Sequence, residues 1–145
     1  MFNESRTDIY DYLYDLLHGV VTDNVYEKRE PQDLTESDAK DGFLVIHVGE
    51  FYDAGEFHGE TYGWTRCYIE AFIPPISRGR MNRELFKSFE DAINQVIKTE
   101  AQRKDGTYTI LEDSLLSMDA DETYNANNQF FTFVKSFIVN VDKQE

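Results

Sequence analysis

The chain has 145 residues, which suits one domain with a hydrophobic core of its own. Hydrophobic residues make up 41% of it and aromatic residues 14%, a composition that excludes a disordered chain. Lys and Arg number 14 against 28 Asp and Glu, and the net charge of −14 argues against wrapping nucleic acid or binding an anionic membrane surface.

The cysteine count and the N-terminal segment indicate the cellular compartment. A single cysteine, Cys67, excludes an internal disulfide framework and a cysteine-rich zinc site. The first residues lack the basic and apolar regions of a signal peptide, and no run approaches membrane-spanning length. We therefore expect a protein made and kept in a reducing cytoplasm.

The first element expected is a helix over residues 3–19, with Ser5 as its cap, Asp8 in the capping-box position and Gly19 as its terminator. Its apolar residues recur at helical spacing: Ile9, Leu13, Leu16 and Val20. A short strand then has to stop by Pro31, and we expect a polar loop over about residues 27–42.

Two strands are expected next, over residues 43–51 and 62–73, joined by a turn-rich segment. The second strand alternates clearly, with small and apolar residues on one face. Its other face carries Tyr62, Trp64, Arg66, Tyr68, Glu70 and Phe72.

The second half of the chain predicts a helix over about residues 83–100, capped by Asn82, and strands over 107–118 and 129–141. The last strand is apolar on both faces, which predicts cover on both sides. The fold class expected is therefore α+β. Residues 1–145 form a single domain with a largely antiparallel sheet and two helices, in the order α-β-β-β-α-β-β.

The sequence gives little support for catalysis. We find no nucleotide-binding loop and no Ser/His/Asp set in a familiar context, so we expect a protein that is not an enzyme and has no cofactor. Four residues of an acidic segment are weak candidates for metal ligands. They are Asp53, Glu56, His58 and Glu60. A solvated acidic hairpin is the preferred interpretation of this segment.

Two features favour a protein–protein contact. Aromatic residues and arginine are enriched at interfaces, so the face with Tyr62, Trp64, Arg66, Tyr68 and Phe72 is a candidate, with partial cover by the polar loop or the first helix as the alternative. The other feature is a run of arginines in an acidic chain, which we expect to meet acidic residues of a neighbouring subunit. These are Arg78, Arg80 and Arg83.

The order of elements resembles the tail-terminator (tail-completion) proteins of long-tailed bacteriophages. The resemblance rests on three stretches: the first helix followed by "NVYEKREP" and "FLVIHVGEF", then "GWTRCYIEAFIP" with the helix "NRELFKSFEDAINQVI", and finally "FFTFVKSFIVNV". It covers nearly the whole chain and is one of pattern.

The resemblance implies a non-enzymatic subunit that forms a ring, commonly a hexamer, on the end of the tail tube. Such a ring contacts the head connector, and DNA passes through it without specific binding, in the bacterial cytoplasm during assembly and then in the virion tail. A different class stays open as an alternative: an acidic binding module, similar to immunity or antitoxin proteins, that covers a basic partner.

Overall fold

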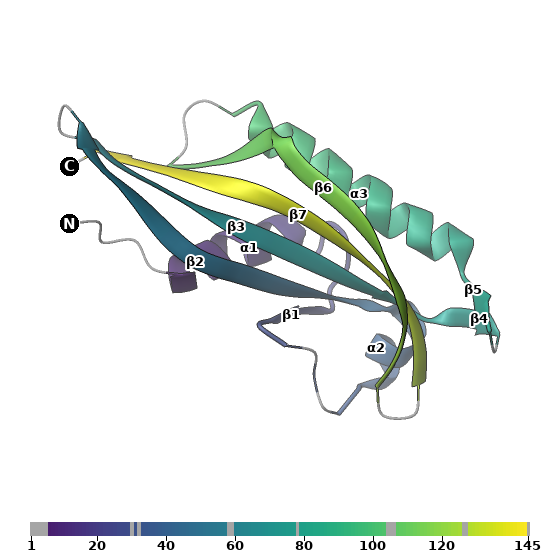
Figure 1. Ribbon diagram of the computed structural model, residues 1–145. Coiled ribbons are helices and arrows are strands. Elements are labelled where there is room, and N and C mark those ends of the chain that lie inside the picture. Colours follow the sequence, from purple (N-terminus) through teal and green to yellow (C-terminus); the bar gives the residue numbers. More distant parts are fainter. Residues whose placement is uncertain are drawn as a thin grey trace.

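A computed structural model shows a five-stranded sheet with two helices packed on one face (Figure 1). The structure describes residues 6–29, 31, 33–57, 60–77, 79–103, 107–125 and 128–144. Within these ranges it describes the side chains except at 6–7, 51–57, 60–62, 119–125, 128 and 142–144. The predicted α+β class with a mostly antiparallel sheet is confirmed.

The elements follow the predicted order with two additions, α2 and the β4–β5 hairpin. They are α1 (Arg6–Leu17), β1 (Val25–Glu27), α2 (Glu36–Asp41), β2 (Phe43–Phe57), β3 (Glu60–Ile73), β4 (Pro75–Ser77), β5 (Arg80–Met81), α3 (Arg83–Ala101), β6 (Tyr108–Asn125) and β7 (Asn128–Gln144). The strand order in the main sheet is β1-β2-β3-β7-β6, with β1 parallel to β2 and every other pair antiparallel.

The main core lies between one face of the sheet and the helices α1 and α3. Alternate residues of β2, β3 and β7 point into it, as the strand period requires, and they include Ile46, Cys67 and Phe137. The buried line of α3 runs through Phe89, Ile93 and Ile97, in the expected helical spacing. Burial of this apolar surface is the main stabilising term of the fold.

The first helix is shorter than expected. It ends at Leu17, and Gly19 follows with a φ of 78°, the left-handed conformation that terminates many helices. Val20 therefore lies outside the helix and is exposed, so its predicted place on the apolar stripe is wrong. The expected cap, Ser5, lies outside the described residues.

The predicted polar loop is wrong over residues 36–41, where the chain forms α2. Thr35 caps this helix, accepting a hydrogen bond from the backbone N–H of Asp38, whose carboxylate in turn accepts one from the backbone N–H of Thr35. The hydroxyl of Tyr26 on β1 also donates to this buried carboxylate, at 2.6 Å. Burial and this hydrogen bond raise the pKa of Tyr26 to about 12.

A second, smaller core covers the other face of the sheet at one end only. Phe43 stacks on Phe72, and the edge of Phe130 meets both rings. Tyr26 and Leu34 pack against this cluster. The prediction that the last strand is covered on both faces is thus right at Phe130.

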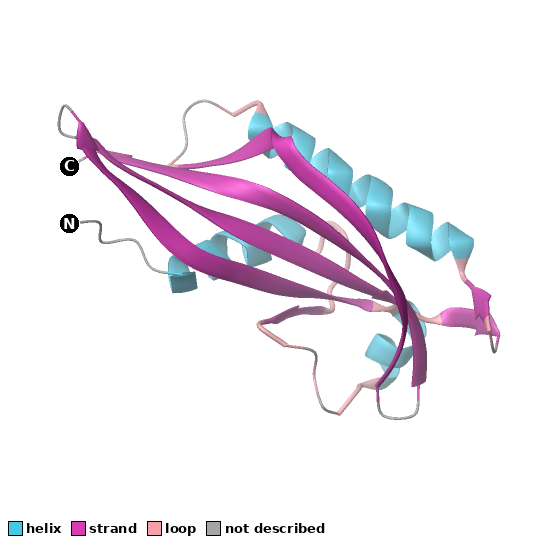
Figure 2. Cartoon of the chain, viewed as in Figure 1, coloured by secondary structure: helices cyan, strands magenta, loops and turns pink. Residues whose placement is uncertain are grey.

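The strands are longer than the sequence predicts. The expected turn over residues 52–61 is wrong: β2 continues to Phe57 and β3 begins at Glu60, with the two strands paired along this stretch. The predicted end of the next strand at residue 118 is likewise wrong, because β6 continues to Asn125 and pairs with β7. Cross-strand pairing overrides the local preference of Gly, Asp and Asn for turns. Figure 2 shows the β2–β3 end of the sheet extending past both helices.

A buried cation ties α3 to the sheet. The side chain of Lys135 on β7 is 3% exposed, and its ammonium donates to Glu90 of α3 at 2.9 Å and to Ser117 of β6 at 2.7 Å. The Glu90 side chain is 35% exposed, so it remains partly hydrated. Removal of Glu90 should therefore cost more stability than removal of Lys135, because the buried ammonium would lose its anion while the glutamate can still be hydrated.

We expect Glu90→Ala to lower the free energy of unfolding by about 2–4 kcal/mol, because it leaves the Lys135 ammonium buried without an anion. Lys135→Met removes the cation and keeps the length of the side chain, so its cost should stay under about 1.5 kcal/mol. Urea denaturation measures both, with Asp91→Ala, at an exposed position of α3, as the control. A larger loss for Lys135→Met than for Glu90→Ala would contradict this asymmetry.

Candidate interaction surfaces

The open face, defined as the side of the sheet away from α1 and α3, exposes apolar side chains on β6 and β7. Leu116 is 55% exposed and Met118 is 50% exposed, and both lie on the edge strand β6. The register places them opposite Ser136 and Val134 of β7. Leu111 is also exposed and pairs with the half-buried Ile138. Contiguous exposed apolar side chains are typical of a surface that binds another protein.

The other half of the open face, over β3 and β2, is polar. Arg66 donates to the hydroxyl of Ser136 at 2.8 Å, which orients the guanidinium along the sheet. His47 Nε2 lies 3.5 Å from a carboxylate oxygen of Glu70. His47 is half-exposed on this face.

The aromatic face of β3 divides into a covered part and an open part. Phe72 is buried in the smaller core, so the alternative of cover by the polar segment is right for this residue. Trp64, Arg66 and Tyr68 lie on the open face, where they remain candidates for a contact. The side chain of Tyr62 lies outside the described residues.

A hairpin with exposed cations projects from the N-terminal end of α3 (Figure 1). The arginine hairpin consists of β4, β5 and the first residue of α3, and it carries Arg80, Arg83 and the exposed Ile76. Pro74 precedes it and Pro75 is its first residue, and both prolines restrict the backbone there. A hollow of about 670 Å³ lies beside these three side chains, and Glu84 also lines it. Arg78 lies outside the described residues.

The edge strand β6 is interrupted by a bulge between Leu111 and Leu116. The hydroxyl of Ser114 donates to the carbonyl oxygen of Leu111 at 2.5 Å and accepts from the backbone N–H of Ile138 at 2.7 Å. The serine thus satisfies an N–H of β7 that the bulge leaves without its usual strand partner. Glu112 and Asp113 are exposed at the bulge.

The bulge borders a second hollow, of about 520 Å³, next to the C-terminal end of α3. This bulge hollow is lined by Ala101, Thr109, Ile110, Leu111, Glu112, Asp113 and Ser114. The sequence pattern predicted a plain strand here and no hollow. The signal was the failure of alternation in "ILEDSLLSM", where two acids and a serine interrupt apolar residues.

A buried polar pair joins α1 to the C-terminal end of α3. The Tyr12 hydroxyl donates to the Glu100 carboxylate at 2.6 Å, and the Arg103 guanidinium lies 3.2 Å from the same carboxylate oxygen. Burial, followed by this hydrogen bond, raises the pKa of Tyr12 well above its ordinary value. The pair therefore positions two helices, and at neutral pH its tyrosine holds its proton.

The residues considered for catalysis or metal binding are one buried cysteine and four residues whose side chains lie outside the described part of the structure. Cys67 is buried, and burial raises the pKa of its thiol to about 12, which indicates a structural thiol. The side chains of Asp53, Glu56, His58 and Glu60 lie outside the described residues. Among the side chains that the structure does describe, no group of three or more His, Cys, Asp or Glu is placed to hold a metal ion.

Comparison with models of known protein families and with curated protein sequences gives no match for this chain. The resemblance to tail-terminator proteins therefore remains a prediction. Within the described ranges, none of the helices combines the length and apolar character needed to cross a membrane.

We expect Ser114→Ala to lower the free energy of unfolding by about 1–3 kcal/mol, because the N–H of Ile138 then loses its acceptor inside the sheet. Ser88→Ala, at an exposed position of α3, is the matched control and should change stability by less than about 0.5 kcal/mol. Urea denaturation compares the two, and equal effects would show that the bulge does not depend on the hydroxyl.

We expect the thiol of Cys67 to react with a disulfide reagent at pH 8 at least about 100-fold more slowly in the folded protein than in denaturant. Burial withholds the reagent, and the raised pKa of the thiol keeps the thiolate scarce. Absorbance during labelling gives both rates, and fast labelling of the folded protein would contradict a structural role.

Proposed function

We propose that this protein is a non-enzymatic structural subunit that assembles with copies of itself into a ring, as tail-terminator proteins of long-tailed phages do. In this proposal the ring ends a tail tube, contacts the head connector and lets DNA pass. Six copies are what the resemblance implies. The subunit is made in the bacterial cytoplasm and ends in the virion tail.

The observation that carries the proposal is the open face. Leu111, Leu116 and Met118 are exposed side by side on an edge strand, next to the half-buried Val134 and Ile138. Each Å² of this apolar surface removed from water contributes roughly 25 cal/mol to association before the costs of binding. Neighbouring subunits would cover such a surface in an assembly, whereas in a monomer it stays exposed to water.

The topology supports the same proposal. A first helix, three strands, a second long helix and a closing pair of strands appear in the order on which the resemblance rests. The additions, α2 and the β4–β5 hairpin, lie outside the five-stranded sheet. They enlarge the surface without changing the order of the main elements.

The charge is compatible with a channel for DNA. A net charge of −14 per subunit repels phosphate, so DNA would not adhere to a wall built from such subunits. The alternative of an acidic module that covers a basic partner has the same net charge in its favour. It predicts a complex with that partner, and it does not require self-association.

We expect the purified protein to form a discrete oligomer whose mass is a multiple of 17.0 kDa, because the open face becomes buried between copies. Light scattering after size exclusion, over a hundredfold range of concentration, measures the mass. Electron microscopy then shows whether the oligomer is a ring, and tail tubes added to the sample test whether they promote it. A monomer under all of these conditions would contradict the proposal and favour the binding module.

A further inference from the structure

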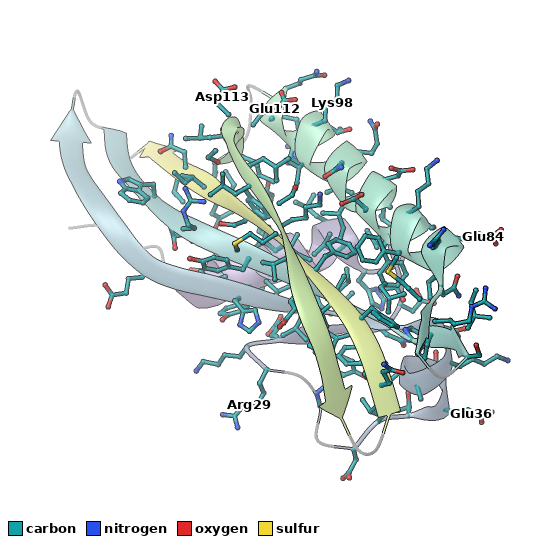
Figure 3. The ribbon with its side chains drawn as sticks, turned by 45° about the vertical axis from the view of Figure 1, so that its right-hand side comes forward. Arg29, Glu36, Glu84, Lys98, Glu112 and Asp113 are labelled. Carbon is teal, nitrogen blue, oxygen red and sulfur yellow. The ribbon has the colours of Figure 1, made fainter. Side chains whose placement is uncertain are left out.

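The two ends of α3 carry surfaces of opposite charge. Arg83 is the first residue of α3, and Ala101, its last residue, lines the bulge hollow. These 19 residues span about 28 Å at roughly 1.5 Å per residue. Figure 3 labels Glu84 at one end of the helix, and Glu112 with Asp113 near the other end, close to Lys98.

We propose that the arginine hairpin of one copy binds the bulge hollow of a second copy, head to tail. This inference rests on the proposed self-assembly and goes further, because it assigns two surfaces, in addition to the open face, that meet between copies. Such a contact is heterologous: each subunit offers its hairpin to one neighbour and its hollow to the other.

Charge complementarity is the first argument. Arg80 and Arg83 are exposed, and within the described part of the chain neither has a carboxylate partner. Glu112 and Asp113 are exposed at the hollow, likewise without a cation partner among the side chains described. Guanidinium and carboxylate groups form strong paired hydrogen bonds when brought together.

The nearby charges do not cancel this pairing. At the hollow, Arg103 already forms an ion pair with the buried Glu100, which leaves Lys98 as the cation beside the two acids in Figure 3. At the hairpin, Glu84 lines the hollow together with two arginines. Among the described residues, the arginine hairpin therefore keeps an excess of positive charge and the bulge hollow an excess of negative charge.

The apolar groups of the two surfaces are also complementary. Ile76 is 67% exposed on the projecting hairpin, which is an unfavourable place for an isoleucine in water. The bulge hollow offers the exposed side chain of Leu111 and the half-buried side chain of Ala101. A protruding apolar side chain and an apolar hollow elsewhere on the same molecule make a head-to-tail contact.

A pair of charge-reversal variants tests the contact. R80E/R83E makes the hairpin acidic, and E112K/D113K makes the hollow basic, so we expect each variant alone to lose the oligomer. Mixed together, each hairpin again meets a hollow of opposite charge, and the oligomer should return with the two variants alternating. The quadruple variant, with both reversals in one chain, should assemble alone.

A charge-matched control tests whether the loss of assembly is specific to the arginine hairpin. R29E/K40E changes the net charge by the same amount as R80E/R83E at exposed sites on other segments, and it should assemble like the wild type. Arg29 lies far from both ends of α3 in Figure 3. Circular dichroism and thermal unfolding establish that every variant folds before its mass is measured.

A cysteine pair reports the direction of the contact. With Ile76→Cys and Leu111→Cys in one chain, oxidation should give a ladder of cross-linked species beyond the dimer, whereas each single variant should give none. Cys67 is buried and does not interfere. A ladder that stops at the dimer would indicate a two-fold contact and overturn the head-to-tail arrangement.

The outcomes separate this inference from the proposed function. An oligomeric wild type whose charge-reversal variants assemble alone would overturn the hairpin–hollow contact and leave the proposed ring standing. Loss of assembly without recovery in the mixture or the quadruple variant would also overturn it. A monomeric wild type would overturn both.

Discussion

The structure depends on a mismatch of length between its strands and its helices. β2, β6 and β7 have 15, 18 and 17 residues, and at roughly 3.3 Å per residue they extend about 50–60 Å. α1 and α3 have 12 and 19 residues, which gives about 18 and 28 Å at roughly 1.5 Å per residue. Two helices of this length cannot cover a sheet of this length, even when both pack on the same face.

Several features of the molecule compensate in part for this mismatch of length. The smaller core around Phe43 closes one end of the second face, with Tyr26 and Leu34 against it and Asp38 of α2 held by Tyr26. The edge strand β6 carries a bulge and acidic side chains, which oppose uncontrolled pairing with other strands. Among the side chains that the structure describes, an apolar strip on β6 and β7 stays uncovered, and the proposed role in an assembly would give that strip a partner.

The sequence predicted the parts of the fold in which one residue pattern dominates. Alternation identified the inward residues of β3 and β7, such as Cys67 and Phe137, and Asn82 was correctly predicted to cap α3. α2 was missed because five of its six residues are polar, which leaves no apolar periodicity. Its signal was the capping box at Thr35 and Asp38, which is local and easily overlooked.

The candidate surfaces were harder to predict, for a related reason. The strand pattern showed that Trp64, Arg66 and Phe72 share one face, but whether that face is open depends on Tyr26 and Leu34, which pack against Phe72. Likewise, Glu112 and Asp113 read as strand residues until the pairing of β6 with β7 reveals the bulge. The cover of Phe72 is tertiary, and no local pattern contains it, whereas the bulge has only a weak local signal, the broken alternation of "ILEDSLLSM".

Charge then limits how such subunits can associate. Copies that each carry −14 repel one another, so a stable contact has to bring the few unpaired cations against acids. A two-fold contact centred on the arginine hairpin would place Arg80 and Arg83 against their own copies, and one centred on the bulge would place acids against acids. Separation of the two surfaces by the length of α3 avoids both conflicts. It favours a repeating head-to-tail contact, which closes into a ring when the rotation between subunits divides a full turn.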